Sequence, residues 1–184
     1  MKLLENKIIC VLIMLVLITG GFWLGGYKGL SGLYSDVESV FFTGEDGDGI
    51  CIENDLTERV NAAENMVTIA RKYNSGSDEV KALSDAAAQM SSLSQNKNIA
   101  ARMDENKKLA TAMSALYREM ADYSLSERDE RYRQSLYADF NSRGDTISHD
   151  PYNSHAQEYN EVLSAFPANI MAAVTPVEEA VIFY

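Results

Sequence analysis

The residues best suited to chemistry lie in an acidic, glycine-rich stretch, residues 43–49 (TGEDGDG). Carboxylates at alternating positions before a turning glycine are typical of calcium-binding loops. With Gly49 as that glycine, Asp46 and Asp48 occupy the third and fifth ligand positions. The first position is then a glycine, and the twelfth is Asp55 rather than a bidentate glutamate, so the match is incomplete. We favour an acidic loop facing water, and keep as the alternative a metal- or calcium-dependent sensor or enzyme that uses Asp46, Asp48 and Asp55.

The two histidines, His149 and His155, are the other residues able to bind a metal or move a proton. They lie six residues apart with Pro151 between them, so they do not share a helical face, and no metal-ligand spacing accompanies them. The sequence also has no nucleophile-elbow motif and no glycine motif for phosphate or dinucleotide binding. We therefore expect no enzymatic activity, no catalytic residues, no cofactor and no metal, and we interpret His155 as an edge residue of an apolar helix face.

The most regular pattern of the chain lies in residues 152–170 (YNSHAQEYNEVLSAFPANI). Its aromatic residues recur every seven positions, at Tyr152, Tyr159 and Phe166. This spacing predicts one apolar face of a helix that ends at Pro167, because proline disfavours helical geometry in the residue before it. We expect all three aromatic rings to pack inward, with the tyrosine hydroxyls reaching the rim of the core.

Two asparagines, Asn153 and Asn160, are also seven residues apart, on one edge of the same predicted helix. Asparagine is a poor helix former, so its repeated use favours specific hydrogen bonds to a neighbouring helix. Two polar residues facing solvent would produce the same pattern. Both interpretations stay open at the level of the sequence.

The helices that would position these groups are predicted by apolar residues at three- and four-residue steps. We expect helices over about 29–42, 55–73, 77–93, 99–123 and 124–143, then a bend or break between about Arg143 and Pro151 and a helix over 151–165. No strand-like alternation of useful length occurs. Long amphipathic helices joined by short polar connectors imply antiparallel neighbours. The predicted fold class is therefore all-α, an up-and-down antiparallel bundle resembling a four-helix bundle and preceded by one transmembrane helix.

The transmembrane helix is predicted over residues 8–27, which carry no charge and are bracketed by Lys7 and Lys28. Twenty residues at a rise of about 1.5 Å each span about 30 Å, the thickness of the hydrocarbon core of a bilayer. A cleaved signal peptide is the alternative, with a small-residue site at residues 19–21. We favour a retained anchor because the apolar run continues past that site. The expected division is 1–7 as a short N-terminus, 8–27 as the membrane helix and 28–184 as the bundle domain.

Charge predicts the orientation and excludes one class of partner. Two lysines precede the predicted span and only Lys28 closely follows it, so the N-terminus is expected in the cytoplasm and the bundle domain outside, at the cell membrane.

Beyond residue 27 the chain has 14 basic and 26 acidic residues, a net charge of −12. Such a surface repels phosphate backbones, so we expect no nucleic acid partner. The expected partners are the membrane, an unidentified protein and, as a further alternative, a second copy through the GxxxG spacing of Gly21 and Gly25.

The motif in residues 152–170 closely resembles the C-terminal signature of the LemA family. The matching positions are Tyr152, Asn153, Tyr159, Asn160, Leu163, Phe166, Pro167 and Asn169. A weaker likeness to an early helix of the family joins Arg59, residues 65–67 (NMV) and Tyr73.

This sequence departs from the family pattern at three places. Glu64 stands where the family has a proline, Pro151 replaces a basic helical residue, and residues 44–49 interrupt a first helix that is usually unbroken. The resemblance implies a bundle of long antiparallel helices on a membrane anchor, and it implies no reaction. Together with the residues themselves it predicts an interaction or scaffolding module at the cell envelope.

Overall fold

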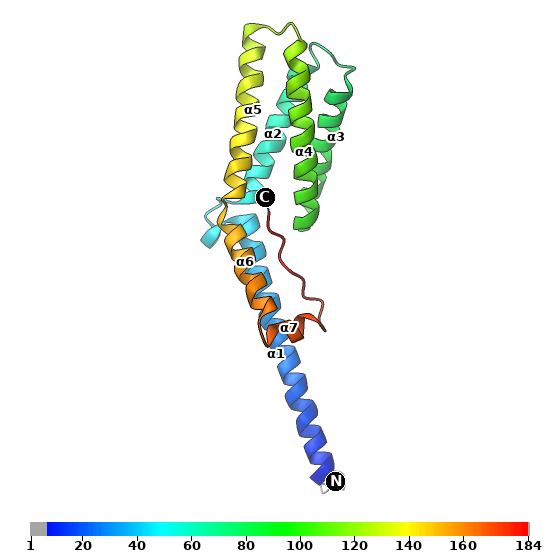
Figure 1. Cartoon of the computed structure of the whole chain (residues 1–184), viewed down its shortest axis with the longest axis vertical. Helices are drawn as coiled ribbons and strands as arrows, with labels where there is room; N and C mark the ends of the chain where they lie inside the picture. Colours follow the sequence, from blue (N-terminus) through cyan, green and yellow to red (C-terminus); the bar gives the residue numbers. More distant parts are fainter. Residues whose placement is uncertain (1–6, 184) are drawn as a thin grey trace. The chain divides into compact units, whose positions relative to one another are not determined.

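The computed structural model describes residues 7–183, and these are mainly helical, without a β-strand. The helices are α1 (Lys7–Thr43), α2 (Ile52–Ala70), α3 (Asp78–Ser92), α4 (Ile99–Glu119), α5 (Glu127–Ser148), α6 (Pro151–Ser164) and α7 (Ala168–Ala172) (Figure 1). Single 3-10 turns follow α1, α3 and α4, at Glu45–Gly47, Leu93–Gln95 and Met120–Asp122. The predicted all-α fold class is confirmed. Most of the predicted N-terminus, residues 1–6, lies outside the described part.

The chain divides into two compact units. The first contains residues 7–38 and 154–180 of the described part, and the second contains residues 39–153 and 181–183. The predicted boundary between membrane helix and bundle domain, at residue 27, lies inside the first unit.

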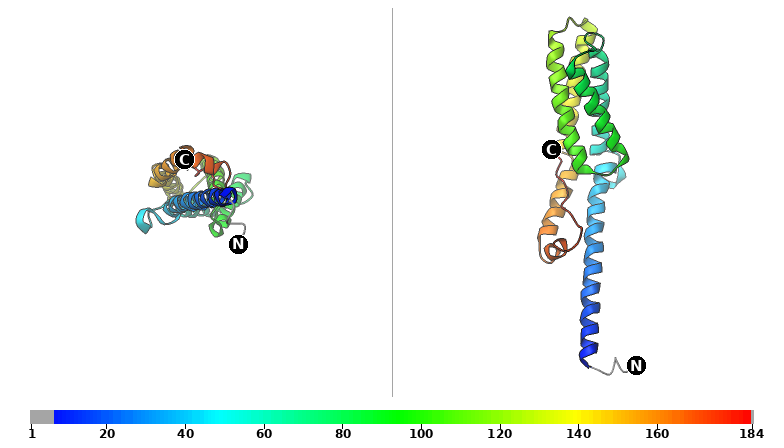
Figure 2. Two further views of the ribbon diagram at one scale, coloured as in Figure 1. Left: turned by 90° about the horizontal axis from the view of Figure 1, so that it is seen from below. Right: turned by 90° about the vertical axis from the view of Figure 1, so that its right-hand side faces the viewer.

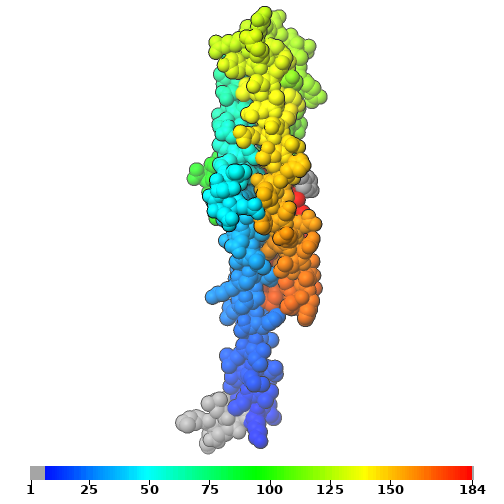
Figure 3. All heavy atoms as spheres, turned by 90° about the vertical axis from the view of Figure 1, so that its left-hand side faces the viewer, coloured from blue at the N-terminus to red at the C-terminus, as the bar shows by residue number. Residues whose placement is uncertain are grey.

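The second unit is built around the antiparallel helices α2 to α5. Helix α2 contacts α3, α4 and α5, and α3 packs along α4 (Figure 2). In α2 and α3 the apolar residues at three- and four-residue steps, which predict the inward faces, are buried, namely Leu56, Val60, Ala63, Val67, Ala70, Val80, Leu83, Ala87 and Met90. On α4 and α5 the buried apolar residues include Leu109, Met113, Leu116, Phe140 and Ile147. Figure 3 shows α2 and α5 lying side by side on one face of the bundle.

Local side-chain caps fix where three of these helices begin. The Ser77 hydroxyl accepts hydrogen bonds from the N–H groups of Glu79 and Val80 at the start of α3. Asn98 and Ser126 cap α4 and α5 in the same way. These caps supply acceptors to N–H groups that have no partner within the helix, which explains why the predicted starts of α3 and α4 agree within about one residue with the observed ones. Helix α5 begins three residues after the predicted opening at Ser124, because the cap is Ser126.

Helix α5 corrects one prediction about the core. The spacing of Tyr132, Leu136 and Phe140 at four-residue steps predicts that Tyr132 faces the core, but its side chain is 49 % exposed, whereas its neighbour Arg133 is buried. The Arg133 guanidinium donates a 2.7 Å hydrogen bond to the carbonyl of Tyr117 and lies 4.2 Å from the centroid of that ring. Burial of a charge requires such partners, so the position of the Tyr117 carbonyl rather than hydrophobicity selects the inward residue.

The first unit combines α1 with α6 and α7. Residues 29–42, where a helix is predicted, continue the apolar span without a break, so that α1 is one helix. Tyr159 of α6 contacts Tyr34 of α1 edge to face, with ring centroids 5.6 Å apart.

The prediction that Phe166 packs inward is wrong. Its side chain is 80 % exposed, while Tyr152 and Tyr159 are buried as predicted. Helix α6 ends at Ser164, and Phe166 lies in the turn before α7, with a cis peptide bond to Pro167. Because the seven-residue repeat describes a helix, it no longer sets the direction of a side chain beyond the helix end.

Candidate functional site

The LemA-like motif holds an extended segment of the same chain. In the first unit, the Asn160 side chain donates a 2.8 Å hydrogen bond to the carbonyl of Ala180 and accepts a 2.7 Å hydrogen bond from its N–H. The Tyr159 hydroxyl donates to the carbonyl of Glu178 at 3.2 Å. Burial raises the pKa of Tyr159, with a smaller contribution from Tyr34, so the hydroxyl keeps its proton and remains a donor.

The second unit repeats this arrangement one heptad earlier on α6. The Tyr152 hydroxyl donates a 2.6 Å hydrogen bond to the carbonyl of Val181. The Asn153 carbonyl accepts a 2.7 Å hydrogen bond from the N–H of Phe183, and its amide donates to the carbonyl of Ile147 at 3.1 Å. We call Tyr152, Asn153, Tyr159 and Asn160 the Tyr-Asn clamp, and residues 178–183 the clamped segment.

The clamp resolves what the two asparagines do. Both are half-buried and bind the main chain of residues 178–183, which has no regular secondary structure. Asn153 also donates to the carbonyl of Ile147 in the neighbouring helix α5, so the predicted bond to a neighbouring helix is made by Asn153. An extended segment without a neighbouring strand leaves its N–H and C=O groups unpaired, and a side-chain amide offers a donor and an acceptor side by side. Asn160 therefore binds Ala180 through both of its main-chain polar groups.

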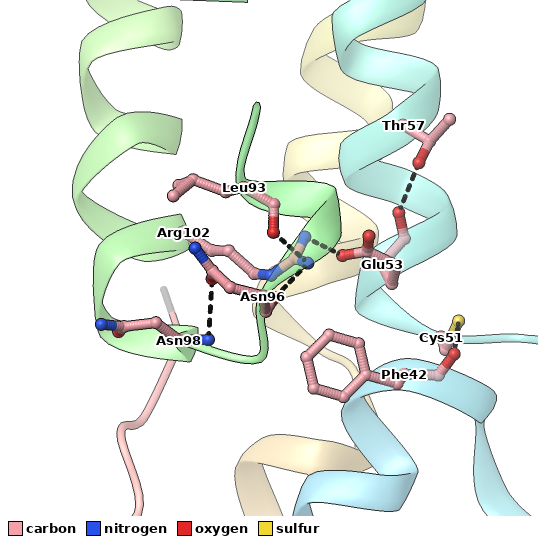
Figure 4. Close-up of polar contacts among 8 residues, drawn as sticks. All are labelled: Phe42, Cys51, Glu53, Thr57, Leu93, Asn96, Asn98 and Arg102. Atoms are coloured by element: carbon pink, nitrogen blue, oxygen red, sulfur yellow. Dashed lines mark hydrogen bonds and ion pairs between the residues drawn. The ribbon is translucent and has the colours of Figure 1, made fainter. Parts of the chain in front are cut away.

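A second cluster, in the bundle, is centred on Arg102 of α4, whose side chain is 3 % exposed (Figure 4). Its guanidinium pairs with Glu53 of α2 and donates hydrogen bonds of 2.8 and 2.9 Å to the carbonyls of Leu93 and Asn96. The ring of Phe42 lies 5.1 Å from the guanidinium carbon. Arg102 therefore joins the start of α2 to the connector between α3 and α4.

Arg102 is not among the predicted site residues, although the sequence carries a signal for it. Buried residues of α4 and the following turn continue at alternating steps of three and four, at Ile99, Arg102, Asn106, Leu109, Met113, Leu116 and Met120. Arg102 and Asn106 occupy positions of this series that would otherwise be apolar, which indicates that their polar groups are buried. Apolar residues alone predict a buried face that begins at Met103, but the structure leaves Met103 half-buried.

A third cluster joins α2 to α5 through Asp55, Arg59 and Arg143. The carboxylate of Asp55 accepts a 2.8 Å hydrogen bond from Arg143. The guanidinium of Arg59 is buried over Phe140, 4.0 Å from the ring centroid. Burial lowers the pKa of Arg59 to about 10, against the opposing effect of Asp55. At Gly144 an added Cβ would lie 3.3 Å from this guanidinium, so the absent side chain lets α5 approach Arg59.

The acidic loop does not gather the predicted ligands around one point. Asp48 accepts a 2.9 Å hydrogen bond from the N–H of Ile50, and Asp55 is held by Arg143. Within residues 7–183, no group of three or more histidine, cysteine or acidic side chains is placed to hold a metal ion. Burial raises the pKa of Asp150, and repulsion from Asp55 and the acidic loop adds to the rise, although a hydrogen bond from Tyr152 N–H opposes it.

The two histidines also lie apart from a ligand cluster. His149 follows α5, is exposed, and its Nδ1 lies 2.9 Å from the carbonyl of Asp145. His155 is half-buried on α6, as expected for an edge residue of the apolar face.

The comparison with protein families matches a model of the LemA family to residues 50–184, which is 135 of the 184 residues. The chain belongs to the LemA family. The match includes the whole Tyr-Asn clamp and the clamped segment, and it begins after α1. Neither the comparison with curated proteins nor that with solved structures finds a match. In this LemA-family chain four of the eight signature residues, those of the Tyr-Asn clamp, thus bind the main chain of residues 178–183.

Replacing Asn160 with alanine is expected to release the clamped segment. The variant removes both hydrogen bonds to Ala180, and at about 0.5–1.5 kcal/mol each this lowers the local opening free energy by about 1–3 kcal/mol. Hydrogen exchange at residues 178–183 should accelerate about five-fold or more, with little change in α2 to α5. Asn141→Ala, at an exposed position in α5, is the matched control. Unchanged exchange at Ala180 would show that these bonds do not hold the segment.

Proposed function

We propose that this LemA-family protein is a single-pass membrane protein that presents its helical bundle as an interaction or scaffolding module at the cell envelope. The observation that carries the proposal is the exposure of the apolar part of α1. Its most apolar 18-residue window has a mean hydropathy of 2.6, and none of that window is buried. A helix that is apolar on all sides and uncovered by its own chain is suited to lipid, where all its main-chain groups bond within the helix.

A cleaved signal sequence would also place an apolar helix near the N-terminus. A retained anchor is supported by the course of α1, which continues through the small residues at 19–21 to Thr43. Contact with α7 adds to this support, because a Cβ at Gly26 would lie 2.9 Å from the Met171 methyl carbon. Removal of residues 1–21 would leave the apolar end of α1 without a complete span.

The proposal includes the orientation and the absence of catalysis. The lysines on either side of the span support a cytoplasmic N-terminus and a bundle outside the cytoplasm. The buried charges of the bundle support a structural role, since Arg102 and Arg133 both donate to main-chain carbonyls and pair with carboxylates. The proposed partners are the membrane and another protein, and the charge of −12 beyond residue 27 argues against nucleic acid.

The membrane arrangement is tested with the exposed position Ser135 on α5. In a Ser135→Cys variant, a membrane-impermeant maleimide should label intact cells, because the native Cys51 is buried and Cys10 lies in the span. The protein should stay in the membrane after alkaline extraction, and its intact mass should include residues 8–27. The unchanged chain is the control for labelling of the native cysteines. Labelling only after lysis would reverse the orientation, and a mass lacking residues 8–27 would replace the anchor with a signal peptide.

The interaction role is tested in the same membranes. A photo-crosslinking residue at Ser135 should yield a discrete adduct on the full chain. Crosslinking that yields no adduct at any of several exposed bundle positions would contradict an interaction module. A residue in the exposed α3 face, such as Ala88, provides a second position for the crosslinker.

A further inference from the structure

The Tyr-Asn clamp recognises main chain rather than side chains. Among the described residues, five hydrogen bonds join the clamp to main-chain atoms of the clamped segment. The clamp donates three of them, to the carbonyls of Glu178, Ala180 and Val181, and accepts two, from the N–H groups of Ala180 and Phe183. Proteins that bind extended peptides use recognition of this kind. Hydrogen bonds to the peptide main chain provide the affinity, and pockets for alternate peptide side chains provide the specificity. The clamp is therefore chemically a peptide-binding site that the chain itself occupies.

The buried side chains of the clamped segment define what the site selects. Ala180 is 4 % exposed and Phe183 is fully buried, whereas Glu178, Glu179 and Ile182 face outward. In the second unit, the Phe183 ring lies 5.4 Å from that of Phe41, which in turn lies 5.1 Å from the ring of Tyr152. The part of the clamp in the first unit thus holds a small residue, Ala180, and the part in the second unit holds an aromatic residue, Phe183.

The segment is connected in a way that permits exchange between copies. Helix α7 ends at Ala172, and residues 173–177, which include Pro176, link it to the clamped segment without helix or strand. A short proline-containing link that is followed by a segment bound in an extended form is the arrangement in which domain swapping occurs at low cost. Each hydrogen bond lost within one copy is regained with the other copy, so the exchange leaves the bonding unchanged.

We propose that the Tyr-Asn clamp of one copy binds residues 178–183 of a second copy. The second copy is the occupant because its segment offers the same main-chain groups to each part of the clamp, with the same small residue, Ala180, and the same aromatic residue, Phe183. Anchoring by α1 favours this exchange, since two copies in one membrane meet at a high effective concentration and in the same orientation. The proposal rests on the proposed interaction role and names the partner.

The test co-expresses two variants that both keep the membrane helix. Each variant lacks one of the two parts that the exchange requires, either the clamped segment or an intact clamp. One chain ends after Thr175, so it has a clamp but no clamped segment. The other carries Asn153→Ala and Asn160→Ala, so it has the segment but a weakened clamp. With different affinity tags and detergent extraction after co-expression, the complementary pair should associate about ten-fold more than either variant with itself, because loss of the asparagines removes three hydrogen bonds to the segment.

Association through the membrane helix is controlled within the same experiment, because all pairs have an identical α1. Equal recovery of all three pairs, with the helical circular dichroism of both variants intact, overturns the proposal. A chain with Asn141→Ala in place of the two clamp substitutions should behave as the unchanged chain.

A second measurement covers the case in which a variant does not fold. A fluorescent peptide of residues 176–183 (PVEEAVIF) should bind the detergent-solubilised chain that ends after Thr175, and its Phe183→Ala form should bind about ten-fold more weakly. Absence of saturable binding to a folded truncated chain overturns the proposal. A discrete crosslinked adduct of the bundle with a different protein, found together with no complementation, also overturns it and leaves the broader interaction role in place.

Discussion

Replacing Arg102 with alanine is expected to lower the free energy of unfolding of the bundle by about 3–5 kcal/mol. The substitution leaves Glu53 without its cationic partner and removes the donor from the carbonyls of Leu93 and Asn96. Arg102 is 3 % exposed, so water cannot readily replace these contacts. The loss exceeds that for an exposed ion pair, for which the typical contribution is about 0–1 kcal/mol. Chemical denaturation monitored by circular dichroism measures the change.

Two further variants separate charge from packing at this cluster. Arg102→Lys keeps the positive charge, but an ammonium lacks the planar set of N–H donors that reaches two carbonyls and a carboxylate at once. This variant should therefore be more stable than Arg102→Ala but less stable than the unchanged chain. Arg118→Ala, at an exposed arginine of the same helix, should change the unfolding free energy by no more than about 0.5 kcal/mol. A loss at Arg102 as small as that at Arg118 would show that the cluster does not join α2 to the connector between α3 and α4.

The second large effect is expected at Asp55, where alanine should cost about 2–4 kcal/mol. Asp55 is buried, accepts a hydrogen bond from Arg143, and counters the charge of Arg59. The side chain of Arg143 is 42 % exposed and can hydrate when it loses its partner, whereas Arg59 remains buried over Phe140. Most of the cost therefore comes from the uncompensated charge of Arg59.

A double-mutant cycle checks this assignment. Arg59→Met removes the buried charge while keeping an apolar side chain of similar length over Phe140, and we expect it to be neutral or stabilising, since burial already lowers the pKa of Arg59 to about 10. In that background Asp55→Ala should cost about 1–2 kcal/mol less than in the unchanged chain. Strictly additive effects would mean that Asp55 acts through Arg143 alone. Denaturation of all four chains at one pH gives the coupling energy.

The two buried charge clusters and the Tyr-Asn clamp differ in what they hold in place. Arg102 and Asp55 join helices of the bundle to one another and to a connector, so their loss is expected to lower global stability. The clamp holds residues 178–183, which have no helix or strand of their own, and its loss is expected to act locally. This difference is why a clamp variant can test partner exchange while the bundle stays folded.

The sequence by itself determined the helices, most of their buried faces and the family signature. Helix periodicity and caps are local properties, so Leu56, Leu83 and Tyr159 could be assigned to buried faces and Ser77 to a helix start from neighbouring residues alone. The apolar span at residues 8–27 is local in the same sense, and α1 includes it without a break.

Only the tertiary structure decided which polar residues enter the core and what the two asparagines bind. Arg133 is buried in place of Tyr132 because the carbonyl of Tyr117, sixteen residues away, lies within reach of its guanidinium. Asn160 forms hydrogen bonds with Ala180, which lies twenty residues further along the chain. The intervening residues form two turns and a short helix, and no local sequence pattern predicts how these place Ala180 beside Asn160. A polar side chain is buried only where a partner meets it, and that partner's position depends on how the whole chain packs.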